Sequence, residues 1–257
     1  MRKCEKMKKL KIMTIIGTRP EIIRLSEVIK KCDMYFEHIL VHTGQNYDYC
    51  LNKAFFEDLN LRKPDYYLDV VGENLGQTIG NVISRSYDIM LKEKPDALLI
   101  LGDTNSALAA ISAKRLKIPV FHMEAGNRCF DENLPEETNR RIVDHIADVN
   151  MCYSEHARRY LNREGTAQER TYVTGSPMAE VLRKNLEKIN KSDVLNRLGL
   201  QEKKYILLSA HREDNIDNID NFNELVDSIN KMAQFYNIPV IYSMHPRSKK
   251  YIEERKT

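Results

Sequence analysis

Short apolar runs alternate with longer amphipathic stretches over the first 183 residues of the chain. Short apolar runs between turn residues predict buried strands, and apolar residues spaced three and four apart predict helices. This alternation is typical of an α/β protein whose parallel sheet is covered on both faces. Ligands of such sheets bind outside the carboxyl ends of the strands, so the residues after each strand are candidates for chemistry. Strands are expected at 10–16, 38–42, 97–101, 120–123, 148–152 and 171–173, and helices at 22–31, 74–91, 104–116, 135–146, 155–163 and 178–186.

A polar stretch over 184–204 interrupts the alternation, and we interpret it as a linker with a short helix at 194–198. We therefore expect a Rossmann-like N-terminal domain over 1–183 and, over 205–257, the start of a second domain. Two strand–helix pairs rarely form an independent α/β domain, so the second domain is expected to be truncated. Its strands are expected at 205–209 and 238–242, and its helices at 222–235 and 249–256.

The composition excludes several classes of protein. Forty Lys and Arg against 37 Asp and Glu give a formal net charge of only +3, with both signs interspersed, so no nucleic-acid partner is expected. A hydrophobic share of 42% supports a packed core. Apolar runs stay far below the roughly 18 residues of a membrane span, and no signal segment follows the basic N-terminus. We expect a soluble, cytoplasmic protein without a membrane partner.

The cysteines give no sign of a metal site or a disulfide framework. They are odd in number, scattered, and without the Cys-x-x-Cys spacing of zinc sites. We therefore expect reduced thiols and no bound metal. The five residues are Cys4, Cys32, Cys50, Cys129 and Cys152.

Polar residues follow the first and third predicted strands. Gly17–Glu21 combines a tight turn with Pro20 at a helix start, and Arg19 would stand near a helix N-terminus, where phosphate is also favoured. A plain strand–helix connector explains these residues equally well. Gly102–Ser106 contains Asp103 among residues that commonly cap helices, so a simple cap explains that turn too.

Carboxylates after consecutive strands are harder to explain as caps alone. Glu124 follows an apolar run directly, and a carboxylate at that depth must be paired, hydrated or used. Glu136 follows Pro135, where an acidic residue also suits a helix start. The helix-start explanation accounts for the residue types but not for Asp103, Glu124 and Glu136 all following strands of one sheet.

The second domain repeats the pattern with basic residues. His211 and Arg212 follow its first predicted strand, and His245–Arg247 follows the next. A histidine beside an arginine at a strand end is suited to a phosphate, although a lone histidine is more often structural.

Five motifs occur in this order along the chain: Gly17-Thr18-Arg19-Pro20-Glu21, Gly102-Asp103-Thr104-Asn105, Met123-Glu124-Ala125-Gly126, Pro135-Glu136-Glu137-x-Asn139-Arg140 and His211-Arg212-Glu213. Together they closely resemble the non-hydrolysing UDP-N-acetylglucosamine 2-epimerase family. The resemblance runs from Met7 to the C-terminus. It implies a GT-B-like fold of two Rossmann-like domains with UDP bound in the cleft, of which the second domain is incomplete here.

One branch of this family fits best, the branch that forms UDP-N-acetyl-L-fucosamine. Asn127–Asp131, Asn139–His145 and Gly175–Met178 resemble that branch. Its members epimerise C2 of UDP-2-acetamido-2,6-dideoxy-L-talose during capsule or O-antigen synthesis.

The resemblance also implies a mechanism and a set of site residues. The C2 proton is removed and UDP is expelled, leaving a 2,3-unsaturated or glycal sugar, and UDP then adds back with protonation from the other face. Carboxylates suit the proton transfers, and arginines with a histidine suit the departing diphosphate. No cofactor and no metal are implied, and the family suggests a homodimer once the second domain is complete. The catalytic positions are Asp103, Glu124, Glu136 and His211, and the substrate-binding positions are Arg19, Arg24 (often Lys in relatives) and Arg212.

Other interpretations remain open from the sequence. The substrate pair could be UDP-N-acetylglucosamine and UDP-N-acetylmannosamine. A GT-B glycosyltransferase would share the architecture but would not require three carboxylates at the sugar. A truncated, inactive fragment is the third alternative, because the family's phosphate loop and ribose-binding acidic residue are not found in these 257 residues. The stretch Gln45–Asp48 only partly matches a region that binds a regulatory UDP-sugar in some relatives.

Overall fold

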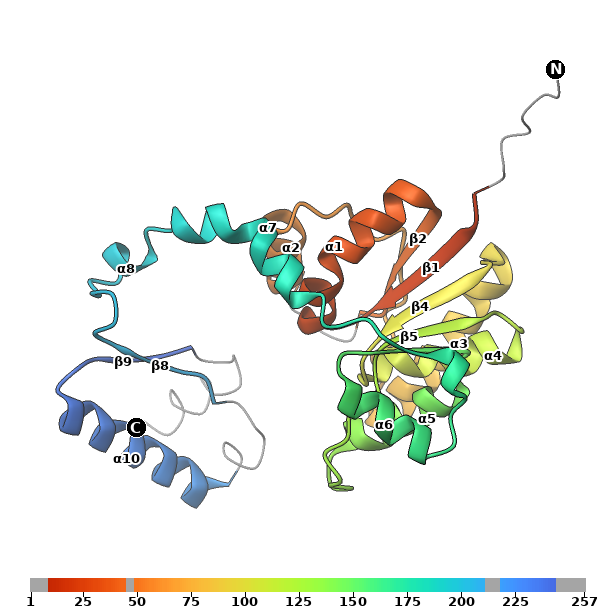
Figure 1. The fold of residues 1–257 in the computed structure, drawn as a ribbon. Helices are drawn as coiled ribbons and strands as arrows, with labels where there is room; N and C mark the ends of the chain where they lie inside the picture. Colours follow the sequence, from red (N-terminus) through yellow and green to blue (C-terminus); the bar gives the residue numbers. More distant parts are fainter. Residues whose placement is uncertain (1–8, 45–48, 211–217, 244–257) are drawn as a thin grey trace. The chain divides into compact units, whose positions relative to one another are not determined.

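A computed structural model describes residues 9–44, 49–210 and 218–243 of the chain. The chain divides into two compact units, Met1–Asn185 and Leu186–Thr257. The first unit is an α/β domain built on one large sheet, and the second contains a small sheet of its own (Figure 1). The α/β fold class expected from the sequence is confirmed.

The large sheet has seven parallel strands in the order β3-β2-β1-β4-β5-β6-β7. Strands β2 and β3 extend the sheet on one side of β1, and strands β4 to β7 extend it on the other side. The carboxyl ends of β1 and β4 therefore form the point where the strand order reverses, which is where open parallel sheets bind ligands. The strands are β1 Lys11–Ile16, β2 Glu37–His42, β3 Tyr66–Tyr67, β4 Ala97–Leu101, β5 Val120–Ala125, β6 Val149–Cys152 and β7 Thr171–Val173.

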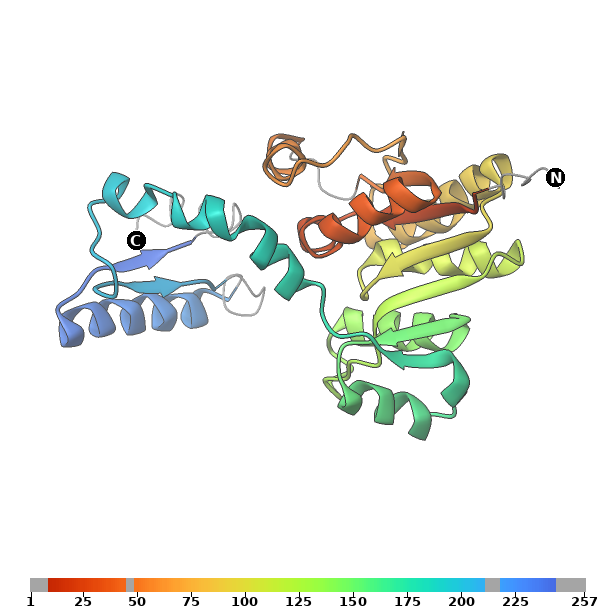
Figure 2. The same ribbon diagram turned by 45° about the horizontal axis from the view of Figure 1, so that its top comes forward.

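Helices cover both faces of this sheet, and each face has its own apolar core. On one face, Met13, Ile15 and Ile100 pack with apolar residues of α3, α4 and α5. On the other face, Ile16 and Leu101 pack with residues of α1 and α2. Figure 2 shows in a second view that helices lie on both sides of the sheet. Burial on two faces explains why the central strands are apolar throughout rather than alternating. The helices are α1 Arg19–Tyr35, α2 Tyr49–Asp58, α3 Leu75–Glu93, α4 Ala109–Arg115, α5 Pro135–Ile146, α6 Glu155–Arg163 and α7 Met178–Asn190, with 3-10 turns η1 Asn105–Leu108 and η2 Gln168–Arg170.

The structure matches most expected elements and corrects several. The helices expected at 135–146 and 155–163 and the strand at 171–173 coincide with α5, α6 and β7. Helix α2 and the two-residue strand β3 were not expected. The helix expected over 104–116 begins instead as η1 and becomes regular at Ala109, and α7 continues beyond 186 to Asn190.

The second unit is described over a shorter range. Strands β8 Ile206–Leu208 and β9 Val240–Tyr242 pair in parallel, and helices α8 Val194–Arg197 and α10 Ile219–Tyr236 accompany them. The helix expected at 249–256 lies outside the described residues. No helix in the described ranges is long and apolar enough to cross a membrane.

Candidate functional site at the carboxyl ends of the strands

The turn between β1 and α1 is built around a buried carboxylate, Glu21. One oxygen of Glu21 accepts hydrogen bonds from the backbone N–H groups of Gly17 (3.0 Å) and Thr18 (2.7 Å) and from the Thr18 hydroxyl (2.8 Å). Its other oxygen accepts from the hydroxyl of Thr104, 3.1 Å away in the turn after β4. Burial raises the pKa of Glu21 to about 7 in spite of these donors. Glu21 therefore ties together the turns after the two central strands.

Asp103 lies in the turn after β4 and faces a positively charged partner. Nε and Nη2 of Arg140, on α5, donate to the same oxygen of Asp103 at 2.9 and 2.5 Å. The side chain of Asn139 donates to the Asp103 carbonyl at 3.0 Å. Only 23% of the Asp103 side chain and 16% of the Arg140 side chain are exposed. Helix α5 thus fixes both the backbone and the carboxylate of Asp103.

Glu124 lies inside β5 rather than after it, and it adopts an unusual backbone conformation. Its φ is +66°, a left-handed value that costs a residue with a side chain about 1–2 kcal/mol. The register between β5 and β6 shifts between Met123 and Ala125, so Glu124 is the extra residue of a β-bulge. Bulges of this kind re-aim a side chain, which explains why a strand residue reaches the carboxyl edge of the sheet.

The Glu124 carboxylate contacts two other polar side chains of the site. Nη1 of Arg24, on α1, contacts one carboxylate oxygen, and the side-chain amide of Asn127 donates to the other at 3.3 Å. Burial raises the pKa of Glu124, the charge of Arg24 opposes the shift, and the charge of Asp103 adds to it. Tyr153, at the end of β6, has its own pKa raised by burial and then by the charge of Glu124. A carboxylate with a raised pKa can both take and return a proton near neutral pH.

The two glutamates at the start of α5 have opposite environments. Glu136 is exposed, and no partner is recorded for it among the described residues. Glu137 is 1% exposed and accepts from the backbone of Cys129 and from Arg140. Burial would raise the pKa of Glu137, but these donors lower it overall. Glu137 therefore holds the loop after β5 in place, and Glu136 is the one of the pair that is free to meet a ligand.

The structure describes some of the remaining predicted residues and not others. Arg19 is half-buried at the start of α1, where its guanidinium lies 5.8 Å from the centre of the Phe55 ring. Arg24 is one turn further along the same helix. His211 and Arg212 lie outside the described residues, as does Gln45–Asp48. The first unit alone thus brings Arg24, Asp103 and Glu124 to one edge of the sheet.

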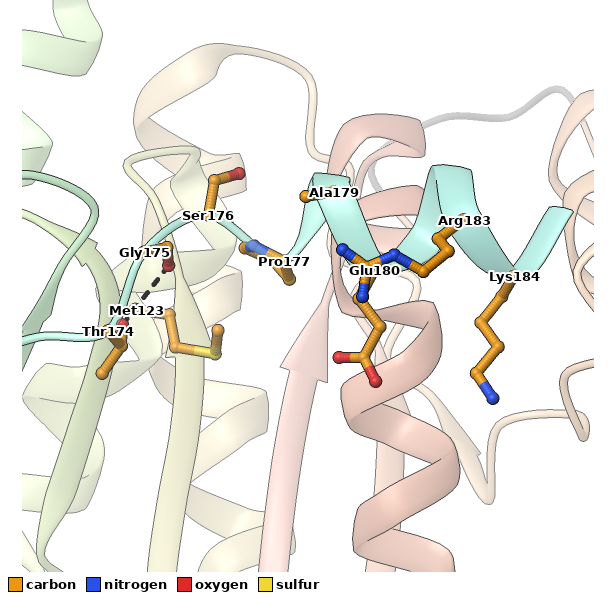
Figure 3. A pocket seen from close by; sticks show the side chains of 9 residues that line it. All are labelled: Met123, Thr174, Gly175, Ser176, Pro177, Ala179, Glu180, Arg183 and Lys184. Atoms are coloured by element: carbon orange, nitrogen blue, oxygen red, sulfur yellow. Dashed lines mark hydrogen bonds between the residues drawn. The ribbon is translucent and has the colours of Figure 1, made fainter. Parts of the chain in front are cut away.

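A pocket of about 550 Å³ opens beside this group of residues. Met123, which directly precedes Glu124, forms one wall, and the loop Thr174–Pro177 after β7 forms another (Figure 3). The first turns of α7 contribute Arg183 and Lys184, and also Glu180, which pairs with Lys31. Pockets of this size bury small-molecule ligands, and the excess of basic over acidic residues in the lining suits an anionic one.

Two residues of the site were missed at the level of sequence. Arg140 was noted within a motif but not as a partner of Asp103, although its position four residues after Glu136 places both on one face of α5. Glu21 was treated as part of a turn. The spacing Thr18-x-x-Glu21 is the signature of a capping box and could have indicated that its carboxylate points back to the turn.

Proteins of known family and structure are similar to this chain over most of its length. The family model described as UDP-N-acetylglucosamine 2-epimerase matches residues 30–257. A solved structure of a UDP-N-acetylglucosamine 2-epimerase from Rickettsia bellii is 53% identical, with a TM-score of 0.88, and the match covers 96% of this chain and 65% of that chain. The 2-epimerase of Methanocaldococcus jannaschii, solved in complex with UDP-GlcNAc and UDP, is 35% identical, with a TM-score of 0.87, covering 96% and 69%.

A relative with a different named substrate is also similar. UDP-2,3-diacetamido-2,3-dideoxy-D-glucuronate 2-epimerase from Pseudomonas aeruginosa is 36% identical over 248 residues, covering 95% of this chain and 69% of the relative. The chain therefore spans about two thirds of the length of the proteins that it matches. Both named activities are 2-epimerisations of UDP-sugars, on sugars with different substituents.

Proposed function

This chain belongs to the UDP-N-acetylglucosamine 2-epimerase family, and on that premise we propose that it takes part in the 2-epimerisation of a UDP-2-acetamido sugar. The observation that carries the proposal is the position of Glu124. A strained bulge residue presents a carboxylate of raised pKa to the edge of the sheet, in contact with Arg24, and its neighbour Met123 lines the pocket. Backbone strain combined with a raised pKa is typical of functional sites.

The chemistry needs a proton acceptor on one face of C2 and a donor on the other. In the proposed reaction the C2–H bond breaks and its proton goes to a carboxylate, while the C1–O bond breaks and its electron pair leaves with UDP. The double bond forms between C1 and C2, giving a glycal. UDP then adds back to C1, and a second carboxylate protonates C2 from the opposite face. Asp103, Glu124 and Glu136 are the candidates for these two roles.

The leaving diphosphate needs positive charge that is already in place. Arg19 and Arg24 lie on the first turns of α1, at the end of the sheet where anions are favoured. By their match to the family motif, His211 and Arg212 are also proposed to act on the substrate. Stabilising the departing UDP in this way lowers the barrier to elimination, because charge develops there in the transition state.

We propose UDP-2-acetamido-2,6-dideoxy-L-talose as the substrate and UDP-N-acetyl-L-fucosamine as the product, in capsule or O-antigen synthesis. Segments that resemble this branch of the family lie next to the site. Asn127 donates to Glu124, and Gly175–Pro177 lines the pocket. Residues in those positions are able to influence which sugar is accepted. The interconversion of UDP-N-acetylglucosamine and UDP-N-acetylmannosamine is the second candidate, favoured by the names of the Rickettsia and Methanocaldococcus proteins.

The test is proton NMR of each UDP-sugar in deuterated water with the folded chain. Deuterium entering at C2, with appearance of the epimer, is the expected result, and faster exchange in one sugar identifies the substrate. Transfer of the sugar to an added acceptor with release of UDP, and without deuterium at C2, would indicate a glycosyltransferase. Absence of both reactions, with UDP-sugar binding observed in the same sample, would contradict the proposal for this chain.

A further inference from the structure

A buried histidine of β5 lies between the turn after β4 and a buried aspartate. His122 lies two residues before Glu124 in β5, and its side chain is completely buried. Its Nε2 lies 2.7 Å from the carbonyl oxygen of Gly102, and its Nδ1 lies 2.9 Å from a carboxylate oxygen of Asp144 on α5. A carbonyl oxygen can only accept, so Nε2 must carry a hydrogen and donate it to Gly102.

The carboxylate beside His122 is also paired with a buried arginine. Nη1 of Arg128 contacts Asp144 at 2.7 Å, and Arg128 forms a two-pronged pair with Glu164 at 2.8 and 2.5 Å. The side chains of Asp144 and Arg128 are fully buried. The cost of an unpaired buried charge is therefore avoided at Asp144.

This cluster connects the two turns that carry the candidate carboxylates. Gly102, whose carbonyl contacts His122, directly precedes Asp103 and has a φ of +72°. Both carboxylate oxygens of Asp144 accept from the N–H of Gly126, at 3.2 Å, on the other side of the bulge from His122. Only glycine fits at position 126, because a Cβ there would lie 2.5 Å from the carbonyl oxygen of Ala157. His122 therefore contacts the turn that carries Asp103, and Asp144 contacts the backbone just after Glu124.

We propose that His122 is a positioning residue of this site: through Gly102 and Asp144, it holds the carboxylates of Asp103 and Glu124 at a fixed separation. It does not touch the substrate. The inference rests on the proposed epimerase function, because a fixed separation matters only if both carboxylates act on one carbon. Displacing one group by about 1 Å is enough to cost about 10²-fold in rate.

The chain offers a matched control at the opposite end of the same sheet. His38, in β2, is also buried beside an aspartate, with Nδ1 2.6 Å from Asp33 and Nε2 2.9 Å from the hydroxyl of Thr14. The Thr14 hydroxyl can donate or accept, so this ring can be neutral with all its contacts kept. Burial lowers the pKa of His38, in spite of Asp33. A histidine-to-glutamine change at either position removes a buried ring of the same size.

The first experiment is nitrogen-15 NMR of the histidine rings in the free protein at pH 7. His122 is expected to carry a hydrogen on Nε2, which it donates to the Gly102 carbonyl. A His122 ring with a bare Nε2 would overturn the proposal. The measurement needs no substrate and no variant, so it judges the cluster even if neither UDP-sugar is turned over; that failure would count against the proposed function instead.

The second experiment compares kinetics of His122→Gln, His122→Asn and His38→Gln. Glutamine can reach the Gly102 carbonyl and asparagine can reach Asp144, but neither can do both. Both His122 variants are expected to lose about 10²-fold in kcat with KM changed less than about threefold, and His38→Gln to keep the wild-type kcat per folded molecule. Wild-type kcat in either folded His122 variant would overturn the proposal, and so would an equal loss in His38→Gln.

Discussion

The two ends of the seven-stranded sheet use the same residue types in opposite ways. At the amino end, three aspartates that directly precede strands each accept the N–H of a neighbouring strand: Asp65 from Leu40 (2.8 Å), Asp96 from Lys11 (2.7 Å) and Asp148 from Val120 (2.8 Å). At the carboxyl end, the buried carboxylates of Glu21 and Glu124 have raised pKa values. The pKa of Asp148, at the amino end, is lowered by its donors, whereas the pKa values of Glu21 and Glu124, at the carboxyl end, are raised.

The difference comes from how burial and partners are combined. Burial alone would raise the pKa of Asp148, but Lys114 and the N–H of Val120 lower it overall. At Glu124, Arg24 does not outweigh burial and the like charge of Asp103. The carboxyl edge of the sheet therefore combines a strained backbone with carboxylates in unfavourable environments, and both lower the stability of the fold. Such a loss of stability is typical of functional sites.

The largest expected effect comes from Glu124→Gln. The amide cannot take a proton from C2, so turnover is expected to fall by about 10³-fold, equal to about 4 kcal/mol in the activation barrier. Deuterium exchange at C2 measures the loss, and circular dichroism checks the fold. Asp148→Asn is the matched control, because it makes the same change at the other end of the sheet. Near wild-type exchange in Glu124→Gln would remove Glu124 from the mechanism.

Glu21 gives the next largest effect, on stability rather than on rate. Because the pKa is raised from 4.5 to about 7 on folding, the folded state disfavours the ionised form. The stability of the wild type relative to Glu21→Gln is therefore fully present below pH 4.5 and is lost as the pH rises through 7. The change across this window is about 3 kcal/mol. Urea unfolding of both proteins between pH 4.5 and 8 measures it, and a pH-independent difference would show that Glu21 is ionised throughout.

Asp148→Asn should have a smaller effect, and of the opposite kind. Loss of the carboxylate weakens the contacts with Lys114 and Val120, at an expected cost of about 1–2 kcal/mol in the free energy of unfolding at pH 7. Because the pKa of Asp148 is lowered on folding, the stabilisation is present above pH 3.8 and is lost as the pH falls through the folded value. Urea midpoints with activity per folded molecule test this. A large loss of kcat would contradict the separation of roles between the two ends.

The smallest effect is expected for Arg24→Lys. A lysine at this position keeps the positive charge beside Glu124 but not the guanidinium geometry, so turnover is expected to stay within about tenfold of the wild type. Arg24→Met, which removes the charge, is the control and should lose more. Equal losses in both variants would show that the shape of the guanidinium, rather than its charge, is what the site requires.

Much of the architecture could be predicted from the sequence, because its signals are local. Helix α5 begins at Pro135 and α6 at Glu155, where a helix-favouring residue stands next to a strong amphipathic pattern. The two-residue strand β3 could not be found in this way, since Tyr66–Tyr67 is a strand only because β2 offers it a partner. The break between η1 and α4 follows from Thr104, whose hydroxyl caps Ser106 and also reaches Glu21 across the sheet.

By itself, the sequence determined the alternation of strands and helices, the family, and the three carboxylates that follow strands, because each of these is encoded in short stretches of neighbouring residues. Only the tertiary structure decided the strand order that brings Gly17–Glu21 and Gly102–Asn105 together, the bulge at Glu124 and the burial of Glu137 instead of Glu136. It also decided that His122 reaches the carbonyl of Gly102 and lies beside Asp144. These features depend on which distant segments share an edge of the sheet, and on how much water that packing removes from each side chain.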